Sequence, residues 1–203
     1  MFQLHAISSG NETATSFAEK AHDIYDIVDY IHIRERSWTV KDYETAIRLV
    51  KAYDPTLQKI IINDRADMAS MYGVQRVHLP EHSYEPVQIR AHFPNLEYGC
   101  AVHQIPFAQS RAREQAKYVM YGHIFHTTCK KDLKPRGLRK LSELVHAVTI
   151  PVIAVGGITA DNISAVMDTG AAGAAVMSNI FSVENVRKSA QAYKDKILEK
   201  GSE

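Results

Sequence analysis

Pro151-Val-Ile-Ala-Val-Gly-Gly-Ile-Thr159 is an apolar run that stops at two glycines, and Gly173-Ala-Ala-Val-Met-Ser-Asn-Ile-Phe181 repeats its character. Continuous Val, Ile and Ala runs are typical of parallel strands buried on both faces. Helix-like sequence follows each run, and backbone N–H groups at a strand-to-helix junction attract anions. The predicted phosphate site after these two strands consists of the N–H groups of Gly156, Gly157, Met177 and Ser178. The alternative is that the glycines only shape two tight turns.

Strand-like and helix-like segments alternate over residues 1–203. The predicted strands are Phe2–Ile7, Tyr30–Ile33, Lys59–Ile62, Arg76–Leu79, Tyr98–Val102, Tyr118–Tyr121, Pro151–Val155 and Ala174–Met177. The predicted helices are Thr15–Tyr25, Thr39–Ala52, Ala66–Met71, Tyr84–Phe93, Pro106–Gln115, Leu138–Val148, Asn162–Thr169 and Val183–Leu198. Eight such units without a linker predict one domain over residues 1–203, folded as a single (β/α)8 TIM barrel. An open, doubly wound sheet is the rival, but eight units and two late glycine turns favour closure.

Composition argues against several kinds of partner. The formal net charge of +1 provides no general field to recruit nucleic acid or an anionic membrane. No apolar run approaches the ~20 residues that a membrane span needs, and residues 1–7 lack the features of a signal peptide. Cys100 and Cys129 have no CxxC spacing, which suits a reducing compartment. We expect a cytoplasmic protein with no nucleic-acid or membrane partner.

Polar side chains gather where the predicted strands end, which is where (β/α)8 barrels place their chemistry. The candidates are Arg34 and Arg36 after the second strand, Asn63 after the third, and Thr127 and Lys130 in the loop 124–136. A small anionic ligand that carries a phosphate and a second acidic group fits this set. Two alternatives stay open: Arg34-Glu35-Arg36 as a solvated loop that pairs with itself, and Asn63-Asp64 as the cap of the following helix.

His123 is the sharpest candidate for proton transfer, since it follows the sixth strand and Gly122 lets the chain turn. An imidazole with an unperturbed pKa near 6.5 both accepts and donates a proton near neutrality. The alternative is a histidine that donates to a nearby carbonyl. Cys129 has lysines beside it of the kind that lower a thiol pKa, but no base adjoins it in the sequence. We therefore expect a contact or packing role for Cys129.

Five segments at the strand ends together resemble a known family. They are Tyr30-Ile-His-Ile-Arg-Glu-Arg36, Ile60-Ile-Ile-Asn-Asp64, Tyr118-Val-Met-Tyr-Gly-His-Ile-Phe125, Cys129-Lys-Lys131 and Pro151–Thr159. Across nearly the whole chain the sequence is similar to the thiamin phosphate synthase superfamily, and it is closer to the TenI-like thiazole tautomerases than to the synthases. The resemblance implies a (β/α)8 barrel, a phosphorylated thiazole as the ligand, and a homodimer.

Departures from the synthase pattern indicate the branch. Where the synthases have a glutamine, a serine and a Gly-Pro, this chain has His32, Ala101 and Gly122-His123. Synthases also hold Mg²⁺ with two acidic ligands, of which Asp64 matches the first, while Ser83 stands at the second position. Since Mg²⁺ binds through carboxylates and substrate phosphates, the loss of one ligand weakens a synthase assignment. Glu81 or Glu85 is a possible substitute for the missing carboxylate.

The resemblance implies a thiazole tautomerase, an isomerase of thiamin biosynthesis that needs no metal and no other cofactor. His123 would take a proton from the carbon that bears the carboxylate and deliver one to the exocyclic side-chain carbon, so that the ring becomes aromatic. Arg34 would offset charge in the intermediate. The implied substrate contacts are Arg34, Arg36, Asn63, Thr127, Cys129 and Lys130, with the phosphate at Gly156, Gly157, Met177 and Ser178. The alternatives are a thiamin phosphate synthase with an altered Mg²⁺ site and a non-catalytic barrel that binds a thiazole phosphate as a regulatory signal.

Overall fold

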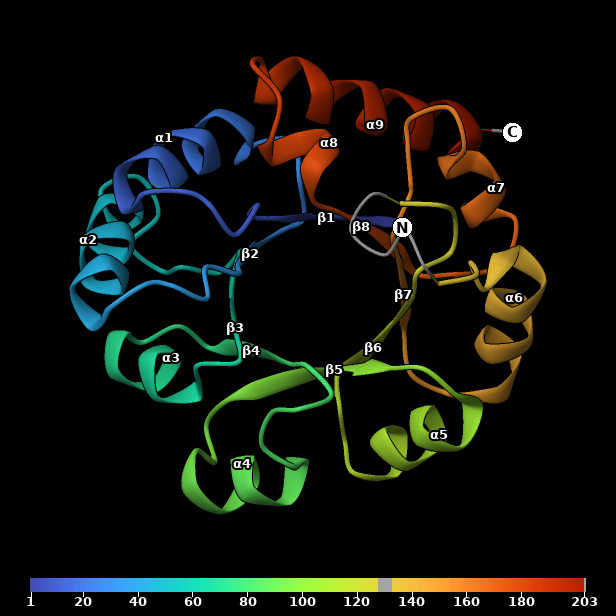
Figure 1. The fold of residues 1–203 in the computed structure, drawn as a ribbon, viewed down its shortest axis with the longest axis horizontal. Coiled ribbons are helices and arrows are strands. Elements are labelled where there is room, and N and C mark those ends of the chain that lie inside the picture. The colour runs from blue at the N-terminus through green and yellow to red at the C-terminus, as the bar shows by residue number, and fades with distance from the viewer. Residues whose placement is uncertain (128–132, 203) are drawn as a thin grey trace.

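Eight parallel strands close into a barrel in the computed structural model of the protein, which describes residues 1–127 and 133–202 (Figure 1). The strands are β1 (Gln3–Ile7), β2 (Tyr30–Ile33), β3 (Ile60–Asn63), β4 (Arg76–Leu79), β5 (Glu97–Val102), β6 (Tyr118–Gly122), β7 (Val152–Val155) and β8 (Gly173–Val176). Each strand pairs with the next one, and β8 closes on β1 with Ala174 opposite Leu4. The predicted (β/α)8 barrel is confirmed, and the open doubly wound sheet is wrong.

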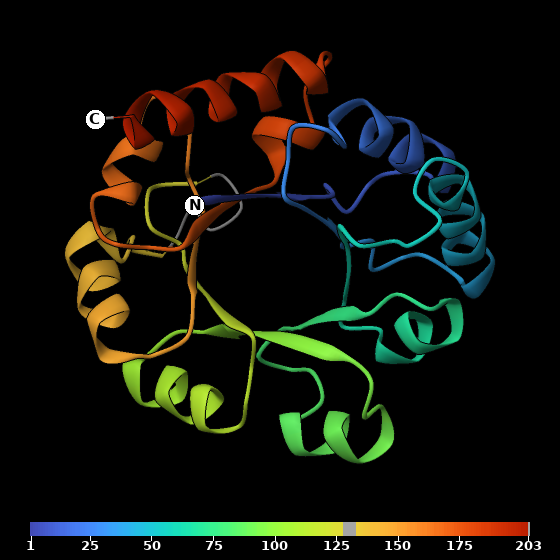
Figure 2. The same ribbon diagram turned by 180° about the vertical axis from the view of Figure 1, so that it is seen from behind.

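Helices surround the barrel and cover the outer face of its strands (Figures 1 and 2). They are α1 (Ala14–Ile24), α2 (Val40–Lys51), α3 (Ala66–Tyr72), α4 (Pro86–His92), α5 (Ile105–Arg113), α6 (Gly137–Ala147), α7 (Ile163–Met167), α8 (Ser178–Phe181) and α9 (Val186–Gly201). Apolar residues at helical spacing are buried, as Phe17, Ala21 and Ile24 of α1 are. Within the described part of the chain, no helix combines the length and the apolar character that crossing a bilayer requires.

The chain after β8 differs from the prediction of one closing helix over 183–198. Two helices follow β8, and the first of them, α8, is a single turn directly after the strand. Ile180 and Phe181 of α8 are both fully buried, which fixes this turn against the barrel. The side chain of Asn185 then caps α9 by accepting the N–H of Lys188 at 2.8 Å. A four-residue helix has too few positions for a helical period to show in the sequence.

The strands are buried on both faces, which explains their continuous apolar sequence. Outward-facing residues such as Leu4 and Ile31 belong to the main core between the strands and the helices. A separate apolar cluster fills part of the barrel interior and includes Ile7, Ile61, Met120, Ile153 and Ala175. Buried polar residues of β1, β2 and β4 are His5, His32 and His78. The barrel is therefore a filled core, and its loops are left to form a site at the C-terminal end.

Candidate functional site

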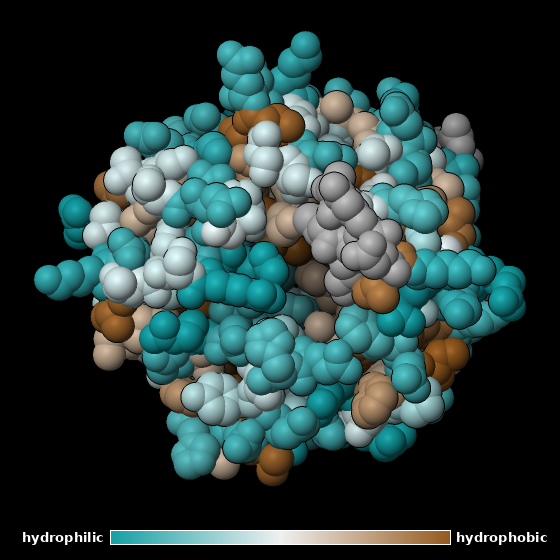
Figure 3. All heavy atoms as spheres, viewed as in Figure 1, coloured by the Kyte–Doolittle hydropathy of each residue, from teal (hydrophilic) through white to brown (hydrophobic). Residues whose placement is uncertain are grey.

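A cavity of about 530 Å³, called the mouth cavity below, opens at the C-terminal end of the barrel. Figure 3 shows this face of the molecule with a hollow at its centre, bordered by many hydrophilic side chains. Its wall contains apolar strand residues together with an unusual number of histidines: His32, His78, His82, His103, His123 and His126. A concave site with a few convergent polar groups suits a small ligand.

The structure brings the predicted site residues to this one cavity. Those on its wall are Arg34, Arg36, Asn63, His123, Thr127, Gly156, Gly157, Met177 and Ser178. Cys129 and Lys130, which were also predicted, lie outside the described residues. Asn63 and Asp64 do not cap the next helix, because Arg65 occupies the N-cap of α3. A single small ligand can therefore reach groups from β2, β3, β6, β7 and β8, although their binding roles stay predictions.

The arginine loop after β2 is organised by Glu35, which is buried. The two carboxylate oxygens of Glu35 accept the backbone N–H groups of Gly10 at 2.9 Å and of Glu12 at 3.2 Å. The carboxylate is thus committed to the loop after β1, unlike that of a solvated loop that pairs its own charges. Arg34 extends toward β8, where its Nη1 lies 3.9 Å from the sulfur of Met177. A guanidinium therefore lies beside the predicted phosphate site.

Gly156 and Gly157 are needed both for their backbone angles and for their neighbours. Their φ angles are +96° and +71°, in the left-handed region that favours glycine. A Cβ on Gly156 would lie 2.4 Å from the Cβ of His123, and one on Gly157 would lie 2.4 Å from the carbonyl oxygen of His126. The glycines therefore shape the turn, as the simpler alternative held, and they also let the His123 loop pack directly against it.

Hydrogen bonds hold the backbone of His123 from two sides. On the β7 side, the N–H of Ile124 donates to the carbonyl of Val155 at 3.0 Å. On the α6 side, the N–H of Arg136 donates to the carbonyl of His123 at 3.0 Å. The Nε of Arg136 also donates to the carbonyl of Gly122 at 2.8 Å. These bonds fix where the imidazole leaves the chain, so its reach into the cavity is restricted.

The ring of His123 is buried, and its Nε2 lies 3.1 Å from the carbonyl oxygen of Leu133. Since a carbonyl only accepts, the neutral ring carries its proton on Nε2 and keeps an unprotonated Nδ1. His123 therefore donates to a nearby carbonyl, which is the alternative role given for it in the sequence analysis. It does not exclude proton transfer, because a hydrogen bond at one ring nitrogen sets the tautomer and leaves a lone pair on the other.

His32 and His78 form the floor of the mouth cavity, and both are buried. Burial lowers the pKa of His78 to about 4. Burial, and after it the proximity of His5 and His78, lowers the pKa of His32 well below its ordinary value. The floor therefore consists of neutral imidazoles near pH 7, since the charged form of a histidine is disfavoured by desolvation.

Several residues of this site are not among those predicted from the sequence. His126 and Asn179 line the mouth cavity a few residues beyond the ends of β6 and β8, Asn179 within α8, and Glu81, considered above only as a possible Mg²⁺ ligand, lines it just beyond β4. A search extended by a few residues past each strand would find them. Arg136 had no such signal, because it acts on backbone carbonyls from the start of α6. Partners of that kind follow only from the tertiary structure.

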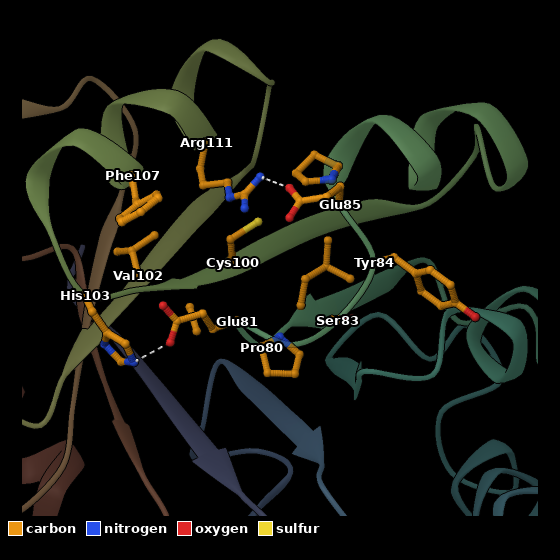
Figure 4. Close-up of a pocket in the computed structure, with 13 residues that line it drawn as sticks. Pro80, Glu81, Ser83, Tyr84, Glu85, Cys100, Val102, His103, Phe107 and Arg111 are labelled. Atoms are coloured by element: carbon orange, nitrogen blue, oxygen red, sulfur yellow. Dashed lines mark hydrogen bonds and ion pairs between the residues drawn. The ribbon is translucent and has the colours of Figure 1, made fainter.

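The positions that would hold Mg²⁺ in the synthases carry one carboxylate and one hydroxyl here, at Asp64 and Ser83. Oδ2 of Asp64 lies 3.6 Å from Nε2 of His82. Ser83 lines a smaller side pocket of about 150 Å³ that borders the mouth cavity near the ends of β4 and β5 (Figure 4). The hydroxyl oxygen of Ser83 is buried there, without a hydrogen-bond partner among the described residues. A neutral hydroxyl in this pocket does not replace a carboxylate ligand.

The two possible substitutes for that carboxylate are engaged by other side chains (Figure 4). Glu85 forms an ion pair with Arg111 at 2.7 Å, and Oε2 of Glu81 lies 3.4 Å from Nε2 of His103. Over residues 1–127 and 133–202, no three His, Cys, Asp or Glu side chains are grouped so that they could hold a metal ion. At the two positions matched to the synthase ligands, the chain therefore supplies a single carboxylate, that of Asp64, and the two possible substitutes each lie beside another side chain.

A comparison with known protein families shows which family the chain belongs to. A family model described as thiamine monophosphate synthase (TMP-TENI) matches residues 4–180. The chain belongs to this family. The thiamine-phosphate synthase of Clostridium acetobutylicum is 30% identical over 177 residues, which cover 86% of this chain and 83% of the relative. The thiamine-phosphate synthase of Pyrococcus furiosus is 34% identical over 158 residues, which cover 77% and 73%.

Solved structures agree with the family assignment. The thiamine phosphate pyrophosphorylase from Pyrococcus furiosus superposes with a TM-score of 0.83 at 27% identity, over 98% of this chain and 96% of that one. A 3-hexulose-6-phosphate synthase reaches a TM-score of 0.74 at 18% identity, over 96% and 99%, and shows the fold alone. The resemblance found in the sequence is confirmed, and the family supports an enzyme of thiamin biosynthesis. Its relatives carry the name synthase, so the tautomerase branch is a proposal.

Proposed function

We propose that the protein is a thiazole tautomerase that aromatises a carboxythiazole phosphate through His123. The observation that carries this proposal is the packing of His123 against the glycine turn, with both on the wall of the mouth cavity. The ring has an unprotonated Nδ1, since its Nε2 is bonded to the carbonyl of Leu133. A phosphate held at Gly156 and Gly157 would keep the reacting carbons of a small ligand near that base.

The proposed reaction moves one proton and one set of double bonds. Nδ1 of His123 removes the proton from the sp³ ring carbon that bears the carboxylate. The electron pair of that C–H bond enters the ring, and the exocyclic double bond takes up the proton from the imidazolium at the side-chain carbon. Substrate and product are isomers, so no co-reactant is consumed. The gain in aromaticity drives the step, and general acid–base catalysis contributes about 10²–10⁴-fold.

Binding groups on both sides of the cavity would support this step. Backbone N–H groups at Gly157 and Ser178 would hold the phosphate, and remote binding energy of that kind orients the reacting atoms. Arg34, beside Met177, would offset the negative charge that spreads over the ring in the intermediate. A homodimer in the cytoplasm is part of the same proposal.

The second candidate is a thiamin phosphate synthase, and the names of the relatives at 30% and 34% identity favour it. That activity would join a thiazole phosphate to a pyrimidine pyrophosphate with Mg²⁺. The positions of Asp64 and Ser83 count against it, because their side chains do not supply the two carboxylates. A condensation that requires Mg²⁺ and the pyrimidine pyrophosphate would move the assignment to the synthase.

A crystal soaked with the aromatic carboxythiazole phosphate tests the proposed geometry. We expect the phosphate at the N–H groups of Gly157 and Ser178, and Nδ1 of His123 about 3–3.5 Å from a reacting carbon. A ligand bound with the ring of His123 turned away from both carbons would contradict the mechanism. A protein that binds this ligand but does not aromatise the tautomer in solution would instead be the regulatory, non-catalytic barrel.

A further inference from the structure

Polar residues replace apolar ones in part of the barrel interior, below the mouth cavity. His5, His32 and His78 are 1%, 1% and 4% exposed. Such layers are normally filled by branched apolar side chains, as they are here at Ile61 and Ile153. A buried polar group costs free energy unless it is hydrogen-bonded. The partners of these histidines therefore indicate what the histidines do.

Gln3 begins a hydrogen-bonded chain at the N-terminal end of the barrel, where it lines a small cavity together with His5. Oε1 of Gln3 lies 3.2 Å from Nε2 of His5, and Nδ1 of His5 lies 2.9 Å from Nε2 of His32. With the amide of Gln3 oriented so that its oxygen faces the ring, neutral His5 carries its proton on Nε2 and accepts at Nδ1, because an amide oxygen only accepts. His32 must then donate from Nε2. Its other nitrogen, Nδ1, is left as an acceptor.

Tyr118 fixes the tautomer of His78, the second histidine of the floor. The remaining ring nitrogen of His78 is a donor, whereas that of His32 is an acceptor. Its hydroxyl oxygen lies 3.1 Å from Nδ1 of His78. A phenol is the better donor and an imidazole nitrogen the better acceptor, and burial raises the pKa of Tyr118 well above its ordinary value, so the phenol keeps its proton. Tyr118 therefore donates to Nδ1 of His78. The proton of His78 is left on Nε2, which becomes a donor.

We propose that Gln3, His5 and Tyr118 are positioning residues that fix the tautomers of His32 and His78. The floor of the mouth cavity then offers a ligand one acceptor, Nδ1 of His32, and one donor, Nε2–H of His78. It selects a ligand with an acceptor such as a carboxylate oxygen above His78 and a donor or polarised C–H above His32. The inference rests on the proposed function only in taking the mouth cavity as the ligand site.

The neutrality of these rings makes the tautomer decisive. Burial, with a smaller effect of His78, lowers the pKa of His5 to about 3, and burial lowers the pKa of His78 to about 4. Near pH 7 the rings therefore carry no charge, and recognition depends on which nitrogen holds the proton. Gln3, at the opposite end of the barrel from the ligand, thereby influences ligand choice through two hydrogen bonds.

Histidine tautomers are read directly from long-range ¹H–¹⁵N NMR spectra of protein labelled with ¹⁵N-histidine, without any ligand. In the unmodified protein we expect His32 to be protonated at Nε2 and unprotonated at Nδ1. Gln3→Lys replaces the acceptor by a donor, so both His5 and His32 should switch to the Nδ1–H form. Gln3→Glu keeps an acceptor oxygen and should leave both tautomers unchanged. This matched pair separates the hydrogen-bond sense from the mere loss of glutamine.

The kinetic consequence should follow the tautomer. We expect kcat/KM for the carboxythiazole phosphate to fall about 10-fold or more in Gln3→Lys, because a buried group that faces a mismatched partner is costly. It should change little in Gln3→Glu.

An Nδ1–H signal for His32 in the unmodified protein overturns the proposal, and so does a folded Gln3→Lys in which Nδ1 of His32 stays unprotonated. If Gln3→Lys does not fold, the spectrum of the unmodified protein decides alone. The tautomers are read without turnover, so an inactive protein would sink the proposed function and leave this inference standing.

Discussion

On the side of the mouth cavity formed by β7 and β8, the contacts that we propose for a ligand are backbone N–H groups near Gly157 and Ser178. On the side formed by β2 to β6 the proposed contacts are side chains, chiefly Arg34, the floor histidines and His123. Backbone donors keep their polarity whatever surrounds them. An imidazole changes from donor to acceptor with its partner. The first side is therefore suited to anchoring a ligand, and the second to chemistry that depends on a proton.

The largest expected effect is on turnover, and it comes from the side of the cavity that carries His123. His123→Asn keeps a polar side chain but removes the proton shuttle, so turnover should fall by about 10²–10⁴-fold. Affinity for the aromatic product should change little, because the phosphate turn is untouched. Turnover is measured by ultraviolet absorbance and affinity by calorimetric titration, and uncatalysed aromatisation sets the lower limit of the rate.

His146→Asn is the matched control, since His146 is an exposed histidine of α6 that bonds to the carbonyl of Ser142. It should keep the parent rate. Parent-like turnover in His123→Asn would mean that the proton shuttle lies elsewhere. If binding and turnover disappear together, His123 is a ligand contact whose catalytic role is unsupported.

Acid should destabilise the protein through the buried histidines of β1, β2 and β4. Folded His5 and His78 have pKa values of about 3 and 4, and that of His32 is well below its ordinary value, whereas unfolded histidines titrate near 6.5. Below pH 6.5 the unfolded chain binds more protons, so stability is complete above that pH and is lost as the pH falls toward 4. At pH 5.5 His5 and His78 should each lower the free energy of unfolding by about 1.4 kcal/mol, and His32 acts in the same direction.

Urea unfolding at pH 7.5 and 5.5 measures this loss. His78→Gln removes one titrating ring and should reduce the loss of stability between the two pH values by about 1.4 kcal/mol. His92→Gln, at an exposed histidine of α4, should leave it unchanged. Equal pH dependence in the two variants would show that the buried ring does not control acid stability.

A smaller effect, on phosphate binding, is expected at the glycine turn after β7. Gly157→Ala should weaken phosphate binding about 10-fold, because hydrogen bonds to a charged group are lost when the turn shifts. Gly73→Ala is the control: its φ of +76° is close to the +71° of Gly157, but a Cβ there meets nothing within 4 Å. Both variants carry similar backbone strain, and only Gly157→Ala displaces the His123 loop. Unchanged affinity for inorganic phosphate in Gly157→Ala would remove the turn from the anion site.

The difference between backbone groups and partner-dependent side chains also explains which features could be predicted from the sequence. Apolar runs such as 152–155 identify strands buried on both faces, and Gly156 and Gly157 mark the turn that follows. His123 was predicted because it directly follows a strand. The hydrogen bond between His5 and His32 could not be predicted, since it joins two strands whose register only the fold provides. The carbonyl partner of His123, in Leu133, was equally hidden because it lies across a loop.

The most direct measurement is the rate at which the carboxythiazole phosphate tautomer becomes aromatic, followed by ultraviolet absorbance in the presence of a chelator. We expect the protein to raise this rate well above that in buffer, and the increase to disappear in His123→Asn. A rate equal to that in buffer, together with Mg²⁺-dependent formation of thiamin phosphate from a pyrimidine pyrophosphate, would contradict proton transfer by His123 and identify a synthase.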